Sequence, residues 1–104
     1  MTHPPIRMKA MRRAAADATT VLRVLANEDR LLLLCQLSQK EASVGELEAL
    51  LDIRQPTLSQ QLGVLRAEGL VATRRDGKRI FYSVADGKVL DLLQTLYGLY
   101  CRKT

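Results

Sequence analysis

Hydrophobic residues recur at helical spacing through the first third of the chain. Over residues 8–26 the pattern predicts an amphipathic helix, whose apolar positions are Ala14, Ala15, Ala18, Val21, Leu22 and Leu25. A second helix is predicted over residues 27–39, because Asn27 is a favourable N-cap and the acidic Glu28 and Asp29 suit the positive end of the helix dipole. Its inward face is expected to hold Leu31, Leu34, Cys35 and Leu37.

Two further helix starts follow. Ser43 and Glu46 have the spacing of a capping box, which predicts a short helix that includes Leu47, Leu50 and Leu51. Residues 52–54 then form a tight connection, and Pro56 is expected at the first position of the next helix. Gly69 is expected to cap the far end of that helix, whose apolar stripe is Leu58, Leu62 and Leu65.

After Gly69 the pattern changes from helical to alternating. It predicts a β-hairpin with Asp76-Gly77 as a type I′ turn and one face formed by Val71, Thr73, Ile80, Tyr82 and Val84. Asp86 is expected to cap a last helix that runs to about Arg102. Its apolar residues lie nearly all round: Val89, Leu90, Leu92, Leu93, Leu96, Tyr97, Leu99 and Tyr100. A small domain cannot cover every side of this helix, so we expect a homodimer formed through the first and last helices.

The predicted order is α-α-α-α-β-β-α, a mainly α fold with a β-hairpin. A pair of short helices followed by a two-stranded ribbon is typical of the winged helix-turn-helix. At 104 residues the chain has the length of one domain, so residues 1–104 are expected to form a single winged helix-turn-helix unit, with residues 1–7 as a loose tail.

The second helix of such a pair lies in the major groove of DNA and contacts base edges with polar side chains near its N-terminus. Here the candidates are hydroxyls and amides that bond base edges or phosphates: Gln55, Thr57, Ser59, Gln60 and Gln61. The hairpin adds basic residues that can neutralise phosphates, namely Arg74, Arg75, Lys78 and Arg79, with Arg54 and Arg66 as weaker candidates. Double-stranded operator DNA is therefore the expected partner.

Composition supports a DNA-binding protein over an enzyme. The net charge is +5, and residues 53–83 hold six basic against two acidic residues. A single histidine, His3, disfavours histidine-based metal or acid–base sites, and no phosphate-binding loop, nucleophile elbow or H-E-x-x-H helix occurs. No cofactor or metal is expected. The longest apolar run, residues 31–35, is far too short to span a membrane and no secretory signal is evident, so we expect a cytoplasmic protein.

Several segments together resemble the ArsR family of bacterial repressors over about residues 18–102. They are the runs NEDRLLLLC from Asn27, SVGEL from Ser43, QPTLSQQLGVLR from Gln55 and RRDGKRIFYS from Arg74. Metalloid sensors of that family carry Cys-Val-Cys where this chain has Val44-Gly45-Glu46-Leu47-Glu48, and its last helix lacks the histidine of the zinc sensors. The chain instead resembles the sulfide- and persulfide-responsive branch, the BigR, SqrR and HlyU-like regulators, because Cys35 and Cys101 stand at that branch's two cysteine positions.

This resemblance implies that the protein is a repressor. Reactive sulfur species, persulfide or polysulfide, would link Cys35 to Cys101 and thereby release the repressor from DNA. A direct disulfide requires the two Cα atoms to lie within about 7 Å, whereas inserted sulfur atoms tolerate a wider gap. Because the attacking species is a thiolate, the basic Arg102 and Lys103 beside Cys101 are expected to favour it. Considered on its own, Cys35 could instead serve as a small buried hydrophobic residue of the core.

Other functions remain open at this point. The cysteines could be two ligands of a metal- or metalloid-responsive repressor, although a third thiolate is missing. The protein could instead be an HlyU-like anti-silencing activator, or a regulator without any ligand. A thiol oxidoreductase is disfavoured because it needs close cysteines beside a βαβ unit. A protein-interaction module would leave the basic hairpin unexplained.

Overall fold

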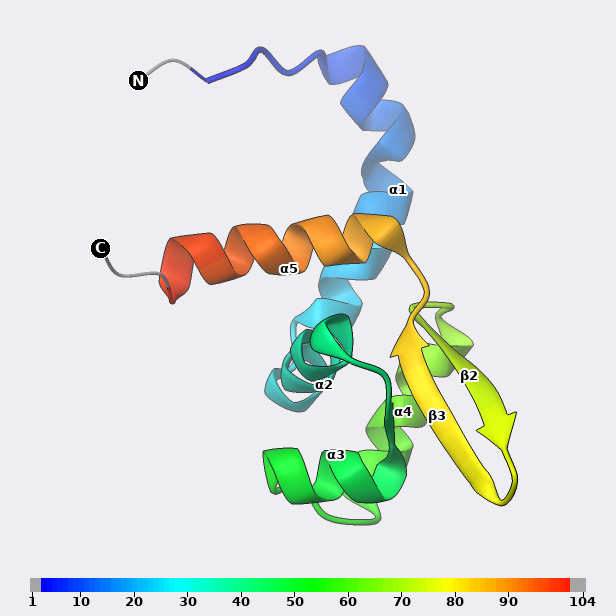
Figure 1. The fold of residues 1–104 in the computed structure, drawn as a ribbon. Coiled ribbons are helices and arrows are strands. Elements are labelled where there is room, and N and C mark those ends of the chain that lie inside the picture. Colours follow the sequence, from blue (N-terminus) through cyan, green and yellow to red (C-terminus); the bar gives the residue numbers. More distant parts are fainter. Residues whose placement is uncertain (1–2, 102–104) are drawn as a thin grey trace.

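The computed structural model describes residues 3–101 and has the predicted order of helices, with one additional strand (Figure 1). The described elements are α1 (Met8–Leu25), α2 (Glu28–Gln39), β1 (Ala42–Ser43), α3 (Val44–Leu51), α4 (Thr57–Ala67), β2 (Val71–Asp76), β3 (Arg79–Val84) and α5 (Gly87–Tyr100). The mainly helical fold with an antiparallel hairpin wing is confirmed, and within residues 3–101 no helix is long and apolar enough to cross a membrane.

Three of the predicted helix starts are also confirmed at atomic level. Asn27 accepts a hydrogen bond from the backbone N–H of Arg30 at 3.0 Å, and Asp86 accepts one from the N–H of Lys88. Ser43 and Glu46 form a complete capping box, each accepting from the other's backbone N–H. These bonds satisfy N–H groups that have no partner within the first turn of a helix.

The core lies where α2, α3 and α4 converge under the start of α5. Its fully buried side chains are Leu33, Leu34, Leu47, Leu58, Leu62, Leu65 and Val89. Leu34 and Leu37 face inward as predicted, Leu31 and Cys35 pack half-buried against the core, and Leu33 is a buried position that the pattern did not single out. An aliphatic core of this kind fixes the positions of α4 and of the wing.

The wing is a three-stranded sheet of order β1-β3-β2 rather than a simple hairpin. The added strand pairs Ala42 with Tyr82 and Ser43 with Phe81. In the hairpin, Val71 pairs with Val84 and the predicted face is confirmed by the register. Since β1 leads directly into α3, the sheet attaches the wing to the start of the helix-turn-helix.

Two local predictions at turns are wrong by one residue. Asp76 pairs with Arg79, so the hairpin loop is Gly77-Lys78 and not Asp76-Gly77. In the described hairpin only Gly77 has a positive φ (63°), which fits glycine at the first central position of a type II′ turn and excludes the type I′ turn, in which both central residues have positive φ.

The second concerns Pro56, which occupies the N-cap position of α4, one residue before the helix. Its carbonyl accepts the N–H of Gln60 at 3.1 Å, as an N-cap carbonyl does. At the other end, Gly69 follows the C-cap with a φ of 77°, as predicted for a glycine that ends a helix.

The first and last helices extend away from this core (Figure 1). Only Val24 and Leu25 of α1 are buried, while Ala14, Ala18 and Leu22 are exposed. Large apolar side chains on both helices face solvent: Met8, Met11, Leu22, Leu90, Tyr97, Leu99 and Tyr100. Helix α5 ends at Tyr100 with Cys101 as its C-cap, and Arg102 and Lys103 lie outside the described residues.

Candidate functional site

Helices α3 and α4 form the helix-turn-helix. The connection between them is held by Ile53, which is buried, and by Asp52, whose left-handed backbone ends α3. Four of the five predicted DNA-contacting residues of this helix and its entry are exposed: Gln55, Thr57, Ser59 and Gln60. The hydroxyl of Ser59 donates to the side-chain oxygen of Gln55, which orients that amide across the first turn of α4.

The fifth predicted residue, Gln61, is not presented to solvent in the same way. It is half-buried, and its side-chain oxygen accepts a hydrogen bond from the guanidinium of Arg30 at 3.0 Å. Arg30 also donates to the carbonyls of Val24 (2.7 Å) and Arg23 (3.4 Å). Arg30 therefore joins the end of α1, the start of α2 and α4, the second helix of the helix-turn-helix, which we call the reading helix. The prediction that Gln61 is exposed is wrong.

The wing divides its basic residues into two groups. Arg74 and Arg79 both lie against the ring of Phe81, with guanidinium carbons 4.7 and 4.9 Å from its centroid. Arg74 forms an ion pair with Glu41, and Arg79 donates to the Ser43 hydroxyl at 3.1 Å. These two arginines thus hold the wing to the segment that precedes α3.

The other two cations face away from this cluster. Arg75 lies on the opposite face of the hairpin, across from Ile80, and Lys78 occupies the second position of the turn. Both are exposed, as are Arg54 and Arg66. Arg54 precedes the start of α4, whereas Arg66 lies in its last turn. Exposed cations of this kind can neutralise phosphates.

The two cysteines lie on different helices and are free thiols. Cys35 on α2 is half-buried, whereas Cys101 at the end of α5 is exposed. Burial raises the pKa of the Cys35 thiol above its ordinary value, and the nearby negative charge of Cys101 raises it further.

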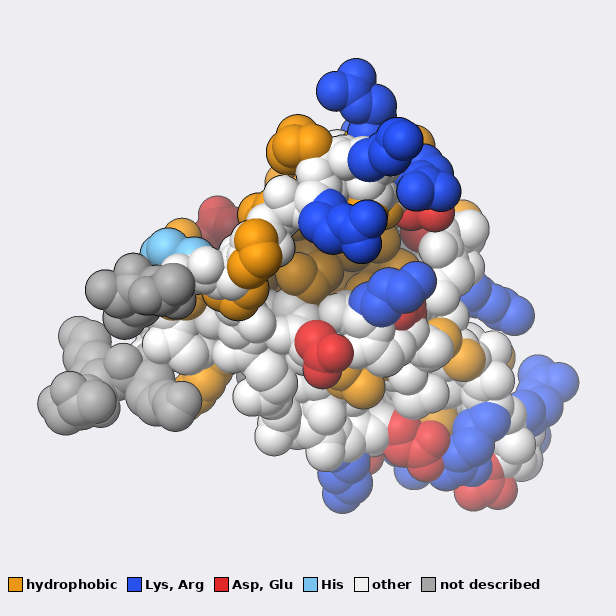
Figure 2. Space-filling view, turned by 90° about the horizontal axis from the view of Figure 1, so that it is seen from above, with side chains coloured by type: hydrophobic (Ala, Val, Ile, Leu, Met, Phe, Trp, Pro, Cys, Tyr) orange, Lys and Arg blue, Asp and Glu red, His pale blue; other side chains and the backbone are white. Residues whose placement is uncertain are grey.

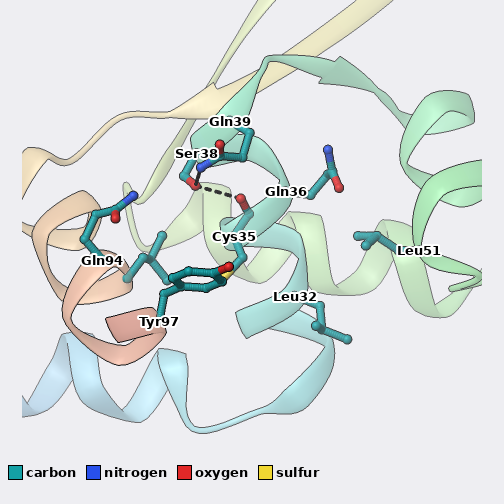
Figure 3. Close-up of a pocket in the computed structure, with 9 residues that line it drawn as sticks. Leu32, Cys35, Gln36, Ser38, Gln39, Leu51, Gln94 and Tyr97 are labelled. Carbon is teal, nitrogen blue, oxygen red and sulfur yellow. Dashed lines mark hydrogen bonds between the residues drawn. The ribbon is translucent and has the colours of Figure 1, made fainter. Parts of the chain in front are cut away.

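Cys35 opens into a cavity of about 500 Å³ between α2 and α5. Tyr97 of α5 lines the same cavity, and its ring lies beside Cys35 (Figure 3). The carbonyl of Tyr97 accepts the backbone N–H of Cys101 at 2.9 Å, so the second cysteine follows one helical turn later. Helix α5 therefore packs against α2 about one turn before Cys101.

Four residues of these sites were missed by sequence reasoning: Arg30, Glu41, Phe81 and Tyr97. The alternation of β3 gave a signal for Phe81, because a residue next to the inward-facing Tyr82 must lie on the opposite face. The partners of Arg30 and Glu41 lie 31 and 33 residues away, beyond any local pattern. Among residues 3–101 there is no group of three or more His, Cys, Asp or Glu side chains placed to hold a metal ion.

Comparison with known proteins agrees with this geometry. The sequence model described as "Bacterial regulatory protein, arsR family" matches residues 27–73. The chain is 54% identical over 96 residues to the biofilm growth-associated repressor of Agrobacterium fabrum, which covers 92% of this chain and 82% of that protein. It is 40% identical over 98 residues to the transcriptional activator HlyU of Vibrio cholerae, covering 94% and 91%. The crystal structure of the transcriptional repressor BigR from Xylella fastidiosa is similar with a TM-score of 0.90 and 44% identity, covering 94% of this chain and 100% of that one.

Proposed function

The chain belongs to the arsR family of bacterial regulatory proteins, and from this premise we propose that it is a homodimeric repressor whose affinity for operator DNA falls when Cys35 and Cys101 become linked. Like its relatives, it is a DNA-binding transcriptional regulator and not an enzyme. The observation that carries the proposal is the placement of Cys35 in the cavity against α5, the helix whose C-cap residue is Cys101.

DNA binding is assigned to α4 and the wing. The exposed amides and hydroxyls of Gln55, Thr57, Ser59 and Gln60 contact base edges in the major groove, and no carboxylate stands among them. Arg75 and Lys78 neutralise phosphates beside the groove.

The dimer is supported by the apolar surface of α1 and α5. In the view from above Figure 1, hydrophobic side chains form patches over the middle and upper part of the face, and most Lys and Arg side chains lie toward its top and right (Figure 2). Leu99 and Tyr100 are 72% and 78% exposed in the single chain, which is unusual for large apolar residues unless a partner covers them. A two-fold pair would set the two α4 helices at half-sites about 34–36 Å apart.

A link between the cysteines would act on this spacing. Cys35 belongs to α2, which packs against α4, and Cys101 is the C-cap residue of α5, which we assign to the dimer interface. Joining them restricts how the reading helix moves relative to the two-fold axis. A coupling free energy of about 1–3 kcal/mol, which lowers affinity about 5- to 150-fold, is enough to empty an operator.

The chemistry requires a sulfur donor or another oxidant, here a hydropersulfide RSSH. One cysteine thiolate attacks the outer sulfur, the S–S bond of the donor breaks, and the thiolate RS⁻ leaves and takes up a proton. The second thiolate then attacks the protein-bound sulfur of the new persulfide and displaces HS⁻. The two cysteines are thereby oxidised to a disulfide, and the donor is reduced to RSH and H₂S.

The test combines intact-mass spectrometry with operator binding at fixed salt. The native protein is compared with Cys35→Ser and Cys101→Ser, each before and after treatment with glutathione persulfide and, separately, with peroxide. In the native protein, we expect treatment to remove the two thiol hydrogens or to add sulfur atoms. We expect it to weaken the DNA binding of the native protein and not that of the two variants. Equal DNA affinity of the linked and reduced native protein would contradict the proposal.

A second possibility is that DNA binding activates transcription by displacing a silencer. It is supported by the 40% identity to a protein named as a transcriptional activator. A reporter driven by the protein's own promoter distinguishes the two: deletion of the regulator raises expression for a repressor and lowers it for an anti-silencer.

A further inference from the structure

The cavity beside Cys35 differs from the rest of the surface in its charge. It is lined by α2, by the end of α3 and by α5, and its nine lining residues are Leu32, Cys35, Gln36, Ser38, Gln39, Leu51, Leu93, Gln94 and Tyr97. None of these side chains carries a formal charge at neutral pH, although charged residues make up 26% of the whole chain. The cleft between α3 and the wing, by contrast, is lined by Glu46, Lys78 and Arg79.

A ligand that carries a carboxylate would lose part of its hydration in this cavity without gaining a cationic partner from the lining. Removing a charge from water without pairing it is costly. The amide groups of Gln36, Gln39 and Gln94 offer hydrogen bonds to neutral polar atoms, and Leu32, Leu93 and the Tyr97 ring offer apolar contact to an alkyl group. The volume of about 500 Å³ lies within the range of small-molecule sites.

We propose that this cavity selects the reagents that reach Cys35, admitting small uncharged electrophiles with an apolar part, such as alkyl hydropersulfides, and disfavouring those that carry carboxylates. This inference rests on the proposed function, since it names the substrate class of the same cysteine. Cys101 is exposed at the end of α5 and lies outside the cavity lining, so it reacts without this selection.

The selection is measured at each thiol separately. In Cys101→Ser only Cys35 remains, and in Cys35→Ser only Cys101 remains. The rates of alkylation by neutral iodoacetamide and anionic iodoacetate are compared at one pH, so that the thiolate fraction cancels in their ratio. We expect the neutral-to-anionic ratio to be about tenfold or more greater at Cys35 than at Cys101. Equal ratios at the two cysteines would overturn the proposal.

A charge placed in the lining tests the cause. Gln94 is exposed at the cavity and lies on α5, where Lys and Glu are equally good helix formers. In the Cys101→Ser background, Gln94→Lys is expected to lower the ratio and Gln94→Glu to raise it. Thr95→Lys, which adds the same charge outside the lining, is expected to change it much less. A ratio indifferent to the charge at position 94 would also overturn the proposal.

Failure of this inference and failure of the proposed function give different results. If linking the cysteines leaves DNA affinity unchanged while Cys35 still prefers neutral reagents, the sensing mechanism fails and the selective cavity stands. If linking weakens DNA binding but the ratio of neutral to anionic alkylation rates is the same at both thiols, the selective cavity fails and the sensing mechanism stands.

Discussion

Arg74 on the wing and Glu41 before the first strand form an ion pair that joins the hairpin to the helix-turn-helix. The Nε of Arg74 lies 2.9 Å from both carboxylate oxygens of Glu41. Hydrogen bonding to this guanidinium holds the pKa of Glu41 below its ordinary value. We expect an arginine engaged in this way to position the wing, and Arg75, which is exposed on the other face of the hairpin, to contact DNA.

Replacing these neighbouring arginines therefore has different consequences. Arg75→Ala is expected to weaken operator binding and to reduce the slope of log affinity against log salt by about one, because one phosphate contact is lost. Arg74→Ala is expected to change this slope less than Arg75→Ala does, so that it stays near the slope of the native protein. Fluorescence anisotropy with labelled operator over a salt series measures both. A slope reduced equally by the two substitutions would show that Arg74 also neutralises a phosphate.

The capping box of α3 predicts a pH dependence of stability. The backbone N–H of Ser43 donates to the Glu46 carboxylate and lowers its pKa. Because the folded pKa is depressed, this stabilisation is present above the unfolded pKa and is lost as the pH falls through the folded value. Glu46→Gln keeps an acceptor but cannot titrate, so its free energy of unfolding should fall less than that of the native protein between about pH 7 and about pH 3.

Urea unfolding at fixed protein concentration checks this difference. Glu48→Gln is the matched control, since it removes a carboxylate from the same helix outside the capping box. A native pH profile reproduced by Glu46→Gln and altered by Glu48→Gln would refute the assignment.

The bond between Arg30 and Gln61 predicts that adjacent glutamines of α4 serve different purposes. Gln61→Ala is expected to lower the free energy of unfolding by about 1 kcal/mol and to leave operator sequence preference unchanged. Gln60→Ala, at an exposed position, should have little effect on stability and should alter sequence preference. Binding to a panel of single-base operator variants separates them. Unchanged stability in Gln61→Ala would remove the structural role argued for this residue.

The features that sequence reasoning located best are those held by local bonds. Asn27, Ser43 and Asp86 each bond to a backbone N–H two or three residues away, so their spacing alone indicates where helices begin. Gly69 follows the same logic at a helix end. The position of the hairpin was also clear, but its exact turn depended on strand register, which paired Asp76 with Arg79.

Features that depend on contacts between distant segments could not be found in this way. The two-residue strand β1 exists because Ala42 and Ser43 pair with β3 some forty positions later. Gln61 stands on the polar side of α4, and its hydrogen bond with Arg30 of α2 joins residues 31 positions apart. Helix α5 is apolar nearly all round, so its pattern could not reveal that Tyr97 is the residue beside Cys35.

The exposed apolar residues at the end of α5 predict how the dimer can be separated. Leu99→Asp places a charge at a side chain that is 72% exposed in the single chain and that we assign to the dimer interface. Burying an apolar side chain of this size contributes about 1.5–3 kcal/mol, and each two-fold interface contains it twice. We expect the variant to sediment as a monomer and to lose operator affinity.

Leu50→Asp is the control, because Leu50 is 60% exposed on α3, which does not belong to the two helices assigned to the interface. It should remain dimeric. A dimeric Leu99→Asp variant in sedimentation equilibrium would place the interface elsewhere.

The influence of Cys101 on Cys35 predicts a measurable change in thiol acidity. Burial is the larger cause of the raised Cys35 pKa, and the negative charge of Cys101 is the smaller one. Cys101→Ser removes only the second cause, so the Cys35 pKa should fall toward its ordinary value but stay above it.

The measurement is the rate of iodoacetamide alkylation of Cys35 against pH, followed by mass spectrometry of the peptide that contains it. Since the folded pKa is raised, the thiol's contribution to stability is fully present below the unfolded pKa and is lost as the pH rises through the folded value. The total loss should be smaller in Cys101→Ser, because its folded Cys35 pKa lies nearer the unfolded one. Identical alkylation midpoints in the native protein and in Cys101→Ser would mean that the two sulfurs do not sense each other, and the proposed link between them would lose its structural support.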